Sequence, residues 1–201
     1  MKFTMSQLRK EIEGHSGPQQ IDQSLINEQI QKTIQGLSKE SILPRNKAIF
    51  NSMVKYLAET KLEVRHKGLL YFGNCGAGKS FALKVIAAFR DIRYYDCEDL
   101  QERFNQSDKG FWEIIEDKKD IIIDDLGTEE AKNDFGIKFE LFEKAIYKRH
   151  KMFEDYKIKT IIATNLDGAG IEKRYDKRIY SRLRQMCECV NATGKDLRFE
   201  E

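Results

Sequence analysis

Apolar residues recur along this chain at two different spacings, and the change from one spacing to the other divides the chain into elements. Short apolar runs have the length and composition of β-strands, and they lie at 68–72, 93–97, 120–124, 159–164 and 187–192. Between them, apolar residues at helical spacing predict helices at 79–90, 98–105, 111–117, 135–154 and about 169–185. This alternation predicts an α/β fold, a three-layer sandwich in which a five-stranded, mostly parallel sheet lies between helices.

The segment before this region has a different character, because residues 1–43 are polar and rich in glutamine. Apolar residues at helical spacing predict one amphipathic helix over about 20–37. A single helix does not fold alone, so it packs either on the main domain or on a partner, and both interpretations stay open. Pro44 suits the first turn of a second helix, which continues to about Glu59. The sequence therefore predicts an N-terminal helical extension at 1–43, as a candidate partner-binding segment, and a main domain at 44–201.

Composition limits the partners that this chain can have. Charged residues make up 34% of the 201 residues, but the two signs nearly cancel and leave a formal net charge of +2. DNA binding would therefore need a local basic patch or a surface built by assembly. No apolar run reaches the roughly 18 residues of a membrane helix, no apolar signal core is present, and scattered cysteines suit free thiols. Cys187 and Cys189 form at most half of a metal site. We expect a cytoplasmic protein with no membrane partner.

A glycine-rich segment gives the clearest chemical signal. Residues 73–80 read GNCGAGKS, which fits the pattern G-x-x-x-x-G-K-[ST] between a predicted strand and a predicted helix. Glycines let backbone amides curl around an anion, and the following helix adds the positive end of its dipole. The candidate phosphate-binding residues are Gly73, Asn74, Cys75, Gly76, Ala77, Gly78, Lys79 and Ser80. We expect Lys79 to reach the β- and γ-phosphates of ATP, and Ser80 to ligate Mg²⁺.

Two apolar strands end in polar residues that would complete this chemistry. Ligands of an open parallel sheet bind beyond the carboxyl ends of its strands. Asp124 is therefore a candidate Mg²⁺ ligand, and Asp125 a candidate to orient or deprotonate the attacking water. Asn165 follows the strand at 159–164, and its amide can contact both a γ-phosphate and that water. The alternatives are that the two aspartates merely begin a loop and that Asn165 caps the next turn.

Arginines crowd the stretch after the last of these strands. Arg178 and Arg182 are four positions apart and share one helix face. A solvated charged face is the ordinary explanation of such a run, whereas one guanidinium beside a γ-phosphate accelerates hydrolysis by roughly 10³–10⁵. The choice between Arg178 and Arg182 for that role stays open. Arg198 is a further candidate phosphate contact.

Together these motifs resemble the AAA+ ATPases, and more narrowly the DnaC/DnaI-type helicase loaders and the related IstB transposition ATPases. The matching pieces span about residues 45–200 and are GNCGAGKS, IIIDDLG, IIATN, the RIYSRL box and the closing DLR. The resemblance implies an AAA+ core without a separate lid domain, preceded here by N-terminal helices. It implies Arg182 as an arginine finger on ATP held by the adjacent subunit, and Arg198 as a second-sensor-like arginine. It also implies a homo-oligomer that binds single-stranded DNA and grips a replicative helicase through an N-terminal module.

Several functions remain open at this stage. The first is a helicase-loader-like ATPase that assembles on single-stranded DNA, and the second is an IstB-like transposition ATPase that acts on duplex DNA. A small-molecule P-loop kinase is the third, although a kinase would need a lid and an acceptor pocket and would not use a subunit-bridging arginine. The fourth is an adaptor that binds ATP without turnover, and the intact pair of Asp124 and Asp125 argues against it.

Candidate DNA contacts are less specific. Basic residues gather around the helix predicted at 135–154, namely Lys144, Lys148, Arg149, Lys151, Lys157 and Lys159. Half or more of such a cluster can be an ordinary solvated face. The pairs Tyr94–Tyr95 and Phe111–Trp112 can stack on bases, with core positions in a strand and a helix as the alternative.

Overall fold

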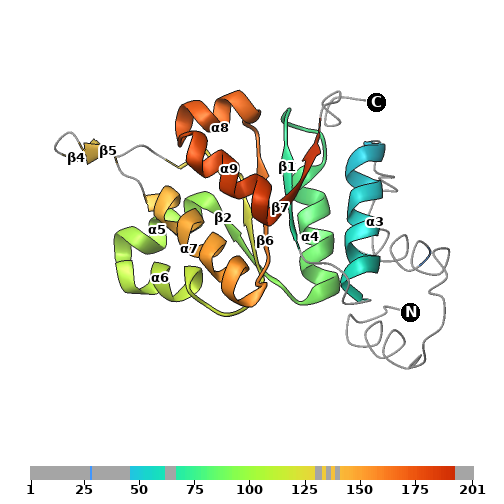
Figure 1. The fold of residues 1–201 in the computed structure, drawn as a ribbon, viewed down its shortest axis with the longest axis horizontal. Helices are drawn as coiled ribbons and strands as arrows, with labels where there is room; N and C mark the ends of the chain where they lie inside the picture. The colour runs from blue at the N-terminus through green and yellow to red at the C-terminus, as the bar shows by residue number, and fades with distance from the viewer. Residues whose placement is uncertain are drawn as a thin grey trace.

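The computed structural model describes residues 28, 46–61, 67–129, 133–134, 137–138 and 141–192. At its centre is a five-stranded sheet in the order β2-β3-β6-β1-β7, in which every neighbouring pair is parallel (Figure 1). The strands are β1 (Gly68–Phe72), β2 (Arg93–Asp96), β3 (Ile121–Asp124), β6 (Thr160–Thr164) and β7 (Cys187–Asn191). The predicted α/β fold class and the five predicted strands are confirmed, and each strand bound differs by at most one residue.

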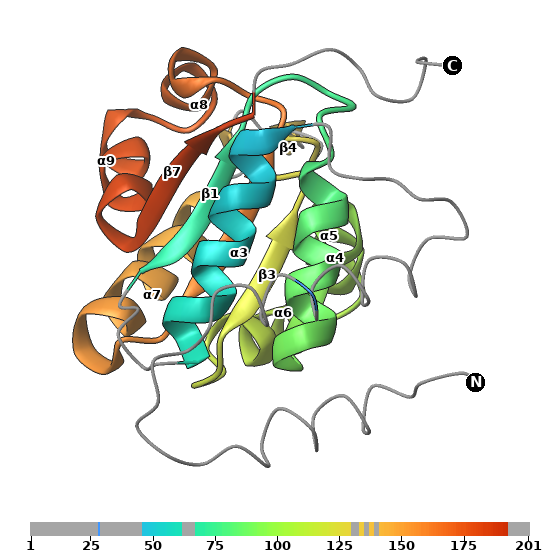
Figure 2. The same cartoon turned by 90° about the vertical axis from the view of Figure 1, so that its right-hand side faces the viewer.

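Helices cover both faces of this sheet. They are α3 (Lys47–Lys61), α4 (Lys79–Arg90), α5 (Cys97–Gln106), α6 (Asp108–Ile115), α7 (Leu141–Tyr156), α8 (Gly168–Arg174) and α9 (Lys177–Met186). Figure 2 shows α3 and α4 on one face, and Figure 1 shows the remaining helices on the other. The architecture is therefore the three-layer sandwich that the alternating pattern predicted.

Side chains of the central strands alternate between two apolar clusters, one on each face of the sheet. Ile122 and Ile161 pack with residues of α3 and α4, whereas Ile121 and Ile162 pack with residues of α5, α6, α7, α8 and α9. Strands β3 and β6 are buried along their whole length. Burial on both faces explains why these two strands are continuous apolar runs in the sequence.

The helix predicted over 169–185 is in fact two helices, α8 and α9, so the single-helix prediction is wrong. The Asp167 carboxylate accepts a hydrogen bond from the Gly170 amide (2.7 Å) and caps α8. The Asp176 carboxylate accepts from the Ile179 amide (2.8 Å) and caps α9. An aspartate that satisfies the free amides of a first turn is a strong helix start, so Asp176 begins a new helix.

The helix predicted over 135–154 is wrong at its beginning. Strand β5 (Ile137–Lys138) pairs antiparallel with β4 (Asn133–Asp134), and α7 begins only at Leu141. Figure 1 shows this small two-stranded sheet projecting away from the main sheet. The sequence carries Gly136 just before β5, and a glycine in a helix interior costs about 1 kcal/mol relative to alanine. The hydrophobic positions after residue 140 belong to helix α7, and the predicted helix was too long at its N-terminal end.

Most of the predicted N-terminal extension lies outside the described residues. Of the helix predicted over 20–37, only Glu28 is described, and it is helical. Helix α3 begins at Lys47, where Asn46 Oδ1 caps the first turn by accepting two backbone amides at 3.2 and 3.3 Å. The start predicted at Pro44 is therefore too early. The division of the chain at residue 43 stays a prediction.

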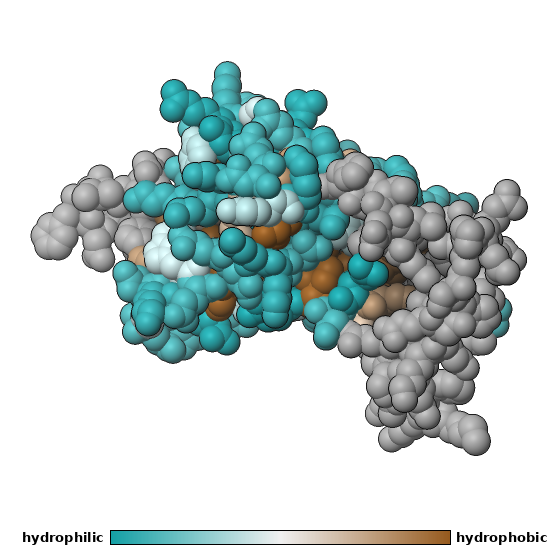
Figure 3. Space-filling model, turned by 60° about the horizontal axis from the view of Figure 1, so that its bottom comes forward, coloured by the Kyte–Doolittle hydropathy of each residue, from teal (hydrophilic) through white to brown (hydrophobic). Residues whose placement is uncertain are grey.

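No helix within the described ranges is long and apolar enough to cross a bilayer. Figure 3 shows one face of the molecule, which is mainly hydrophilic with small separate hydrophobic areas.

Arg149 on α7 is part of the fold and not of a DNA-binding surface. Its side chain is 1% exposed, and burial lowers its pKa to about 10, against the opposing charge of Asp120. Its Nε donates to Thr160 Oγ1 at 2.9 Å, and its two terminal nitrogens donate to four backbone carbonyl oxygens, those of Ile115, Asp117, Lys119 and Lys159. The guanidinium therefore ties the end of α6 and the segments that lead into β3 and β6 to α7.

The fold also excludes or weakens three other candidate DNA contacts. Phe111 is fully buried in the cluster beneath α6 and cannot stack on a base. Lys148 Nζ lies 2.7 Å from Glu116 Oε1, and Lys159 Nζ lies 3.6 Å from Asp120 Oδ2. Both lysine charges are therefore paired with a carboxylate of the same chain.

We expect Arg149→Met to destabilise the fold strongly. The substitution removes five hydrogen bonds to oxygen atoms, all of them buried or partly buried, and a buried polar group that loses its partner costs about 1–3 kcal/mol. The free energy of unfolding, measured in urea, should fall by at least about 3 kcal/mol. The control is Lys151→Met on the exposed side of the same helix, which should change stability by less than about 0.5 kcal/mol. Equal stability of the two variants would contradict the structural role of Arg149.

Candidate functional site

The loop between β1 and α4 has the backbone of an anion cradle. Gly73, Gly76 and Gly78 have φ angles of 123°, 74° and 91°, which lie in the left-handed region. Only glycine adopts this region without cost, so the loop needs glycine at these places. Left-handed residues interspersed in a short loop let successive amides converge on one point, which is the geometry that holds phosphates.

The beginning of α4 adds to this cradle. Gly78 is the residue that caps the helix, and among the described residues no side chain accepts the amides of its first turn. The first turn also contains no acidic residue. Free amides and the positive end of the helix dipole therefore remain available to an anion at this end of α4. Ser80 lies in this first turn, beside Lys79.

Lys79 lies inside the loop and not on the surface, with an exposed fraction of 5%. Its Nζ donates to the carbonyl oxygens of Gly73 (2.9 Å) and Asn74 (2.7 Å) and to Asn165 Oδ1 (2.8 Å). Burial lowers the pKa of Lys79, and the nearby Cys75 and the two aspartates after β3 oppose this shift. A cation is thus held at the centre of the cradle, at the end of the strand β6.

The two aspartates at the end of β3 have different surroundings. Asp124 is 1% exposed; its Oδ1 accepts from the Asp125 amide (2.9 Å), and its Oδ2 accepts from the Tyr94 hydroxyl. Asp125 has a left-handed backbone (φ 52°), and its carboxylate accepts from Asn165 Nδ2 at 3.2 Å. Burial raises the pKa of Asp125, with a further contribution from Asp124, whereas Lys79 lowers it. Asp125 is therefore the more accessible of the pair.

These side chains meet because the strands end at one level. Phe72 of β1 pairs with Thr164 of β6, and Asp96 of β2 pairs with Asp124 of β3. The turn after β3 is fixed to β6, since the Leu126 amide donates to the Ala163 carbonyl oxygen at 2.9 Å. The structure thus brings together Lys79, Asp124, Asp125 and Asn165. The side-chain bonds of Asn165 go to Lys79 and Asp125, and α8 is capped by Asp167 instead.

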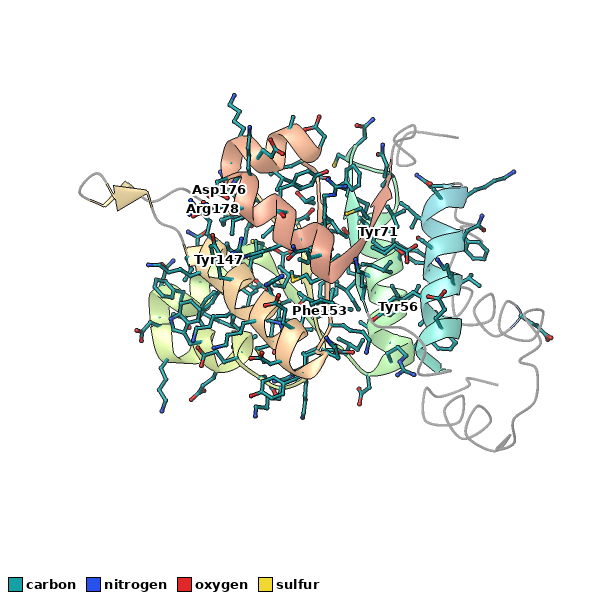
Figure 4. All side chains as sticks on the ribbon, viewed as in Figure 1. Tyr56, Tyr71, Tyr147, Phe153, Asp176 and Arg178 are labelled. Atoms are coloured by element: carbon teal, nitrogen blue, oxygen red, sulfur yellow. The ribbon has the colours of Figure 1, made fainter. Side chains whose placement is uncertain are left out.

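The arginines of the predicted finger lie on the other helical layer. The Arg182 guanidinium lies over the Tyr147 ring at 4.2 Å, and its Nη1 donates to the Arg178 carbonyl oxygen at 3.1 Å. Figure 4 shows Arg178 and Tyr147 close together on the α7 and α9 side, away from α4. Arg182 also lines a hollow of about 810 Å³ on the surface of α6, α7 and α9. Arg198 lies outside the described residues.

Two residues that the sequence patterns did not select hold this site together. One is Tyr94, a candidate for base stacking whose hydroxyl donates to Asp124. The other is Glu129, which is buried and accepts from the Gly127 amide (2.8 Å), Arg174 Nε (3.2 Å), Cys97 Sγ (3.1 Å) and the Tyr175 hydroxyl. Burial and the Glu129 charge raise the pKa of both Cys97 and Tyr175, so both remain protonated donors. Glu129 thereby connects the turn after β3 to α5 and α8.

The described residues contain no group of three or more histidine, cysteine or acidic side chains that could hold a metal ion. Cys187 is buried and Cys189 is exposed, and both are free thiols. A magnesium site of the kind predicted for Ser80 and Asp124 takes few protein ligands and completes its shell with phosphate oxygens and water, so it does not depend on such a group.

A cradle after the first strand of a parallel sheet, with acids at the tip of a buried strand nearby, defines the P-loop class of folds. Several solved structures have a similar fold. A candidate primosome component from Streptococcus pyogenes serotype M3 matches with a TM-score of 0.57 and 18% identity over 76% of this chain and 84% of its own.

Two further solved structures belong to replication proteins. DnaI matches with a TM-score of 0.57 and 21% identity over 78% of this chain and 88% of its own. AMPPCP-bound DnaA from Aquifex aeolicus matches with a TM-score of 0.50 and 16% identity over 75% of this chain and 47% of its own. Neither a protein-family model nor a curated protein matches the sequence. At these identities the likeness shows a shared fold, and the predicted α/β fold is confirmed as one like those of DnaI and DnaA.

We expect Glu129→Gln to weaken the connection between the turn after β3 and α8. The amide keeps the shape of the side chain but removes the charge to which Arg174 and Tyr175 donate. Hydrogen bonds to a charged group contribute about 1.5–3 kcal/mol, so the free energy of unfolding in urea should fall by about 2 kcal/mol.

The matched control is Glu113→Gln on α6, where the carboxylate is 66% exposed. That variant should unfold at the same urea concentration as the unmodified chain. Equal effects at the two positions would mean that the buried hydrogen bonds of Glu129 are not important for stability.

Proposed function

We propose that this chain binds ATP with Mg²⁺ and hydrolyses it, as an AAA+ ATPase of the replication type. The observation that carries this proposal is the hydrogen-bonded series from Lys79 through Asn165 to Asp125, at the mouth of a glycine cradle. One solved structure of the same fold, that of DnaA, holds AMPPCP, an ATP analogue. The uncapped first turn of α4 and the three left-handed glycines fit a bound triphosphate.

Each residue has a distinct part in this proposal. The amides of residues 73–78 and the Lys79 ammonium would hold the phosphates, with Arg198 as a further phosphate contact, and Ser80 and Asp124 would hold the ion. When bound there, Mg²⁺ would supply a positive charge that offsets the negative charge of the phosphates. Asp125 orients the water and accepts its proton, for which a pKa raised by burial is suited. Asn165 contacts both Lys79 and Asp125, so it is placed to respond to a phosphate that attracts Lys79.

The biological role that we propose is that of a helicase-loader-like ATPase that assembles on single-stranded DNA. The fold shared with DnaI and with a candidate primosome component supports this choice. In this proposal the chain forms a homo-oligomer, Arg182 acts on ATP held by the adjacent subunit, and a replicative helicase is the partner. The IstB-like transposition ATPase on duplex DNA and the small-molecule kinase remain the competing functions.

Lys79→Ala should abolish nucleotide binding, because it removes the cation at the centre of the cradle. Binding is measured by titration with a fluorescent ATP analogue, and turnover by phosphate release. The control is Arg90→Ala, which removes an exposed cation from the last turn of the same helix and should leave both unchanged. Unchanged hydrolysis by the Lys79 variant would contradict the assignment of the loop.

Arg182→Ala should leave nucleotide affinity nearly unchanged and reduce hydrolysis by roughly 10³-fold or more. A mixture of Arg182→Ala and Asp125→Asn chains should recover part of the activity, because each variant supplies what the other lacks. Arg178→Ala is the matched control on the same helix. If the mixture stays as inactive as its components, the site is not shared between subunits.

The three functions are distinguished by the ligand that stimulates turnover. Phosphate release is measured alone and with single-stranded DNA, duplex DNA or nucleosides. Stimulation by single strands supports the loader, stimulation by duplex supports the transposition ATPase, and a phosphorylated nucleoside supports the kinase.

A further inference from the structure

Tyr94 reaches across from the edge strand β2 to the buried carboxylate of Asp124. Its hydroxyl donates to Asp124 Oδ2, while the Asp125 amide donates to Oδ1 at 2.9 Å. Each carboxylate oxygen therefore has one donor from the chain. With both oxygens held, the carboxylate plane has a single orientation at the tip of β3, although each oxygen keeps a lone pair for another contact.

Strand pairing and ring packing hold the Tyr94 side chain in place, in addition to its hydrogen bond to Asp124. Tyr94 pairs in register with Ile122, two residues before Asp124, and its ring packs on the apolar cluster that contains Ile122. Lys84 Nζ lies 5.8 Å from the ring centroid on the outer side. Tyr95, the next residue, belongs to the cluster on the opposite face of the sheet. Strand alternation therefore sends one of these two tyrosines toward the site and the other away from it.

We propose that Tyr94 is a positioning residue for the magnesium ion of the nucleotide complex, acting through the orientation of Asp124. This inference rests on the proposed function. Groups that orient a metal ligand from outside its shell typically change metal affinity by 10–100-fold when they are removed. A tyrosine that served only to satisfy a buried carboxylate would affect stability but would not affect the ion specifically.

The test is Tyr94→Phe, which removes one oxygen atom and keeps the ring. Binding of a fluorescent ATP analogue is measured first in EDTA and then during titration with MgCl₂. The affinity in EDTA should match that of the unmodified chain, and the Mg²⁺ concentration for half-maximal effect should rise by about 10-fold or more. Tyr95→Phe removes the same atom on the other face of the sheet and should change neither value.

A second comparison separates the role of Asp124 from other effects. In chains that already carry Asp124→Asn, adding Tyr94→Phe should produce no further change in the Mg²⁺ titration, because the oriented carboxylate is gone. A further loss on that background would overturn the proposal, as would an unchanged Mg²⁺ titration of the single variant.

Two other results have distinct meanings. Loss of affinity in EDTA for Tyr94→Phe would show that the hydroxyl supports the whole cradle, and the specific role toward the ion would be wrong. If the unmodified chain binds no nucleotide at all, the proposed function fails, and this is seen before any variant is compared.

Discussion

The site depends on the alignment of the carboxyl ends of four parallel strands, β1, β2, β3 and β6. Because β1 and β6 pair in register and β2 pairs with β3 in the same direction, the polar residues after each strand meet at one edge of the sheet. The strands behind this edge are dry, with Ile121, Ile122, Ile161 and Ile162 fully buried. Charged groups cannot be accommodated further down these strands, so sequence and burial together confine the reactive side chains to the edge.

The charges of Lys79 and Asp125 at this edge stabilise each other, and hydrogen bonds through Asn165 connect them. Lys79 is a buried cation whose burial lowers its pKa, and Asp125 is a carboxylate whose burial raises its pKa. Each shift is opposed by the other group, and Asn165 connects the two through its oxygen and nitrogen. An anion that attracts Lys79 would break its hydrogen bond to Asn165 Oδ1. It would also weaken the electrostatic effect by which Lys79 lowers the pKa of Asp125. The arrangement therefore couples a phosphate in the cradle to the basicity of the carboxylate that would act on water.

The sequence predicted the features that follow from local hydrophobic patterns. It also predicted those that follow from the rule that ligands bind beyond the carboxyl ends of parallel strands. It predicted the five strands, helix α4 to the residue, and the set of Lys79, Asp124, Asp125 and Asn165 that the structure brings together. It missed Tyr94, Glu129 and the burial of Arg149. In the sequence, Tyr94 is 30 residues from Asp124, Glu129 is 45 residues from Arg174, and Arg149 is 34 residues from Ile115. No hydrophobic periodicity indicates contacts between residues so far apart. It also missed the break before α9, because one aspartate as a helix cap was outweighed by a continuous apolar stripe.

The position of Arg182 gives the strongest physical argument for assembly. Its contacts are with Tyr147 of α7 and with its own helix, on the layer opposite α4. A guanidinium acts on a phosphate only at contact distance, because its planar donors must meet the phosphate oxygens. In the proposed assembly, α9 keeps its packing in the cluster on this face, and the phosphate that Arg182 reaches would belong to another molecule. Glu129 strengthens this relation, since it binds both the turn after Asp125 and Arg174 of α8, the helix that leads into α9. In the proposed assembly, a change at one nucleotide site would be carried through the buried hydrogen bonds of Glu129 to α8 and then to α9, the helix that holds Arg182.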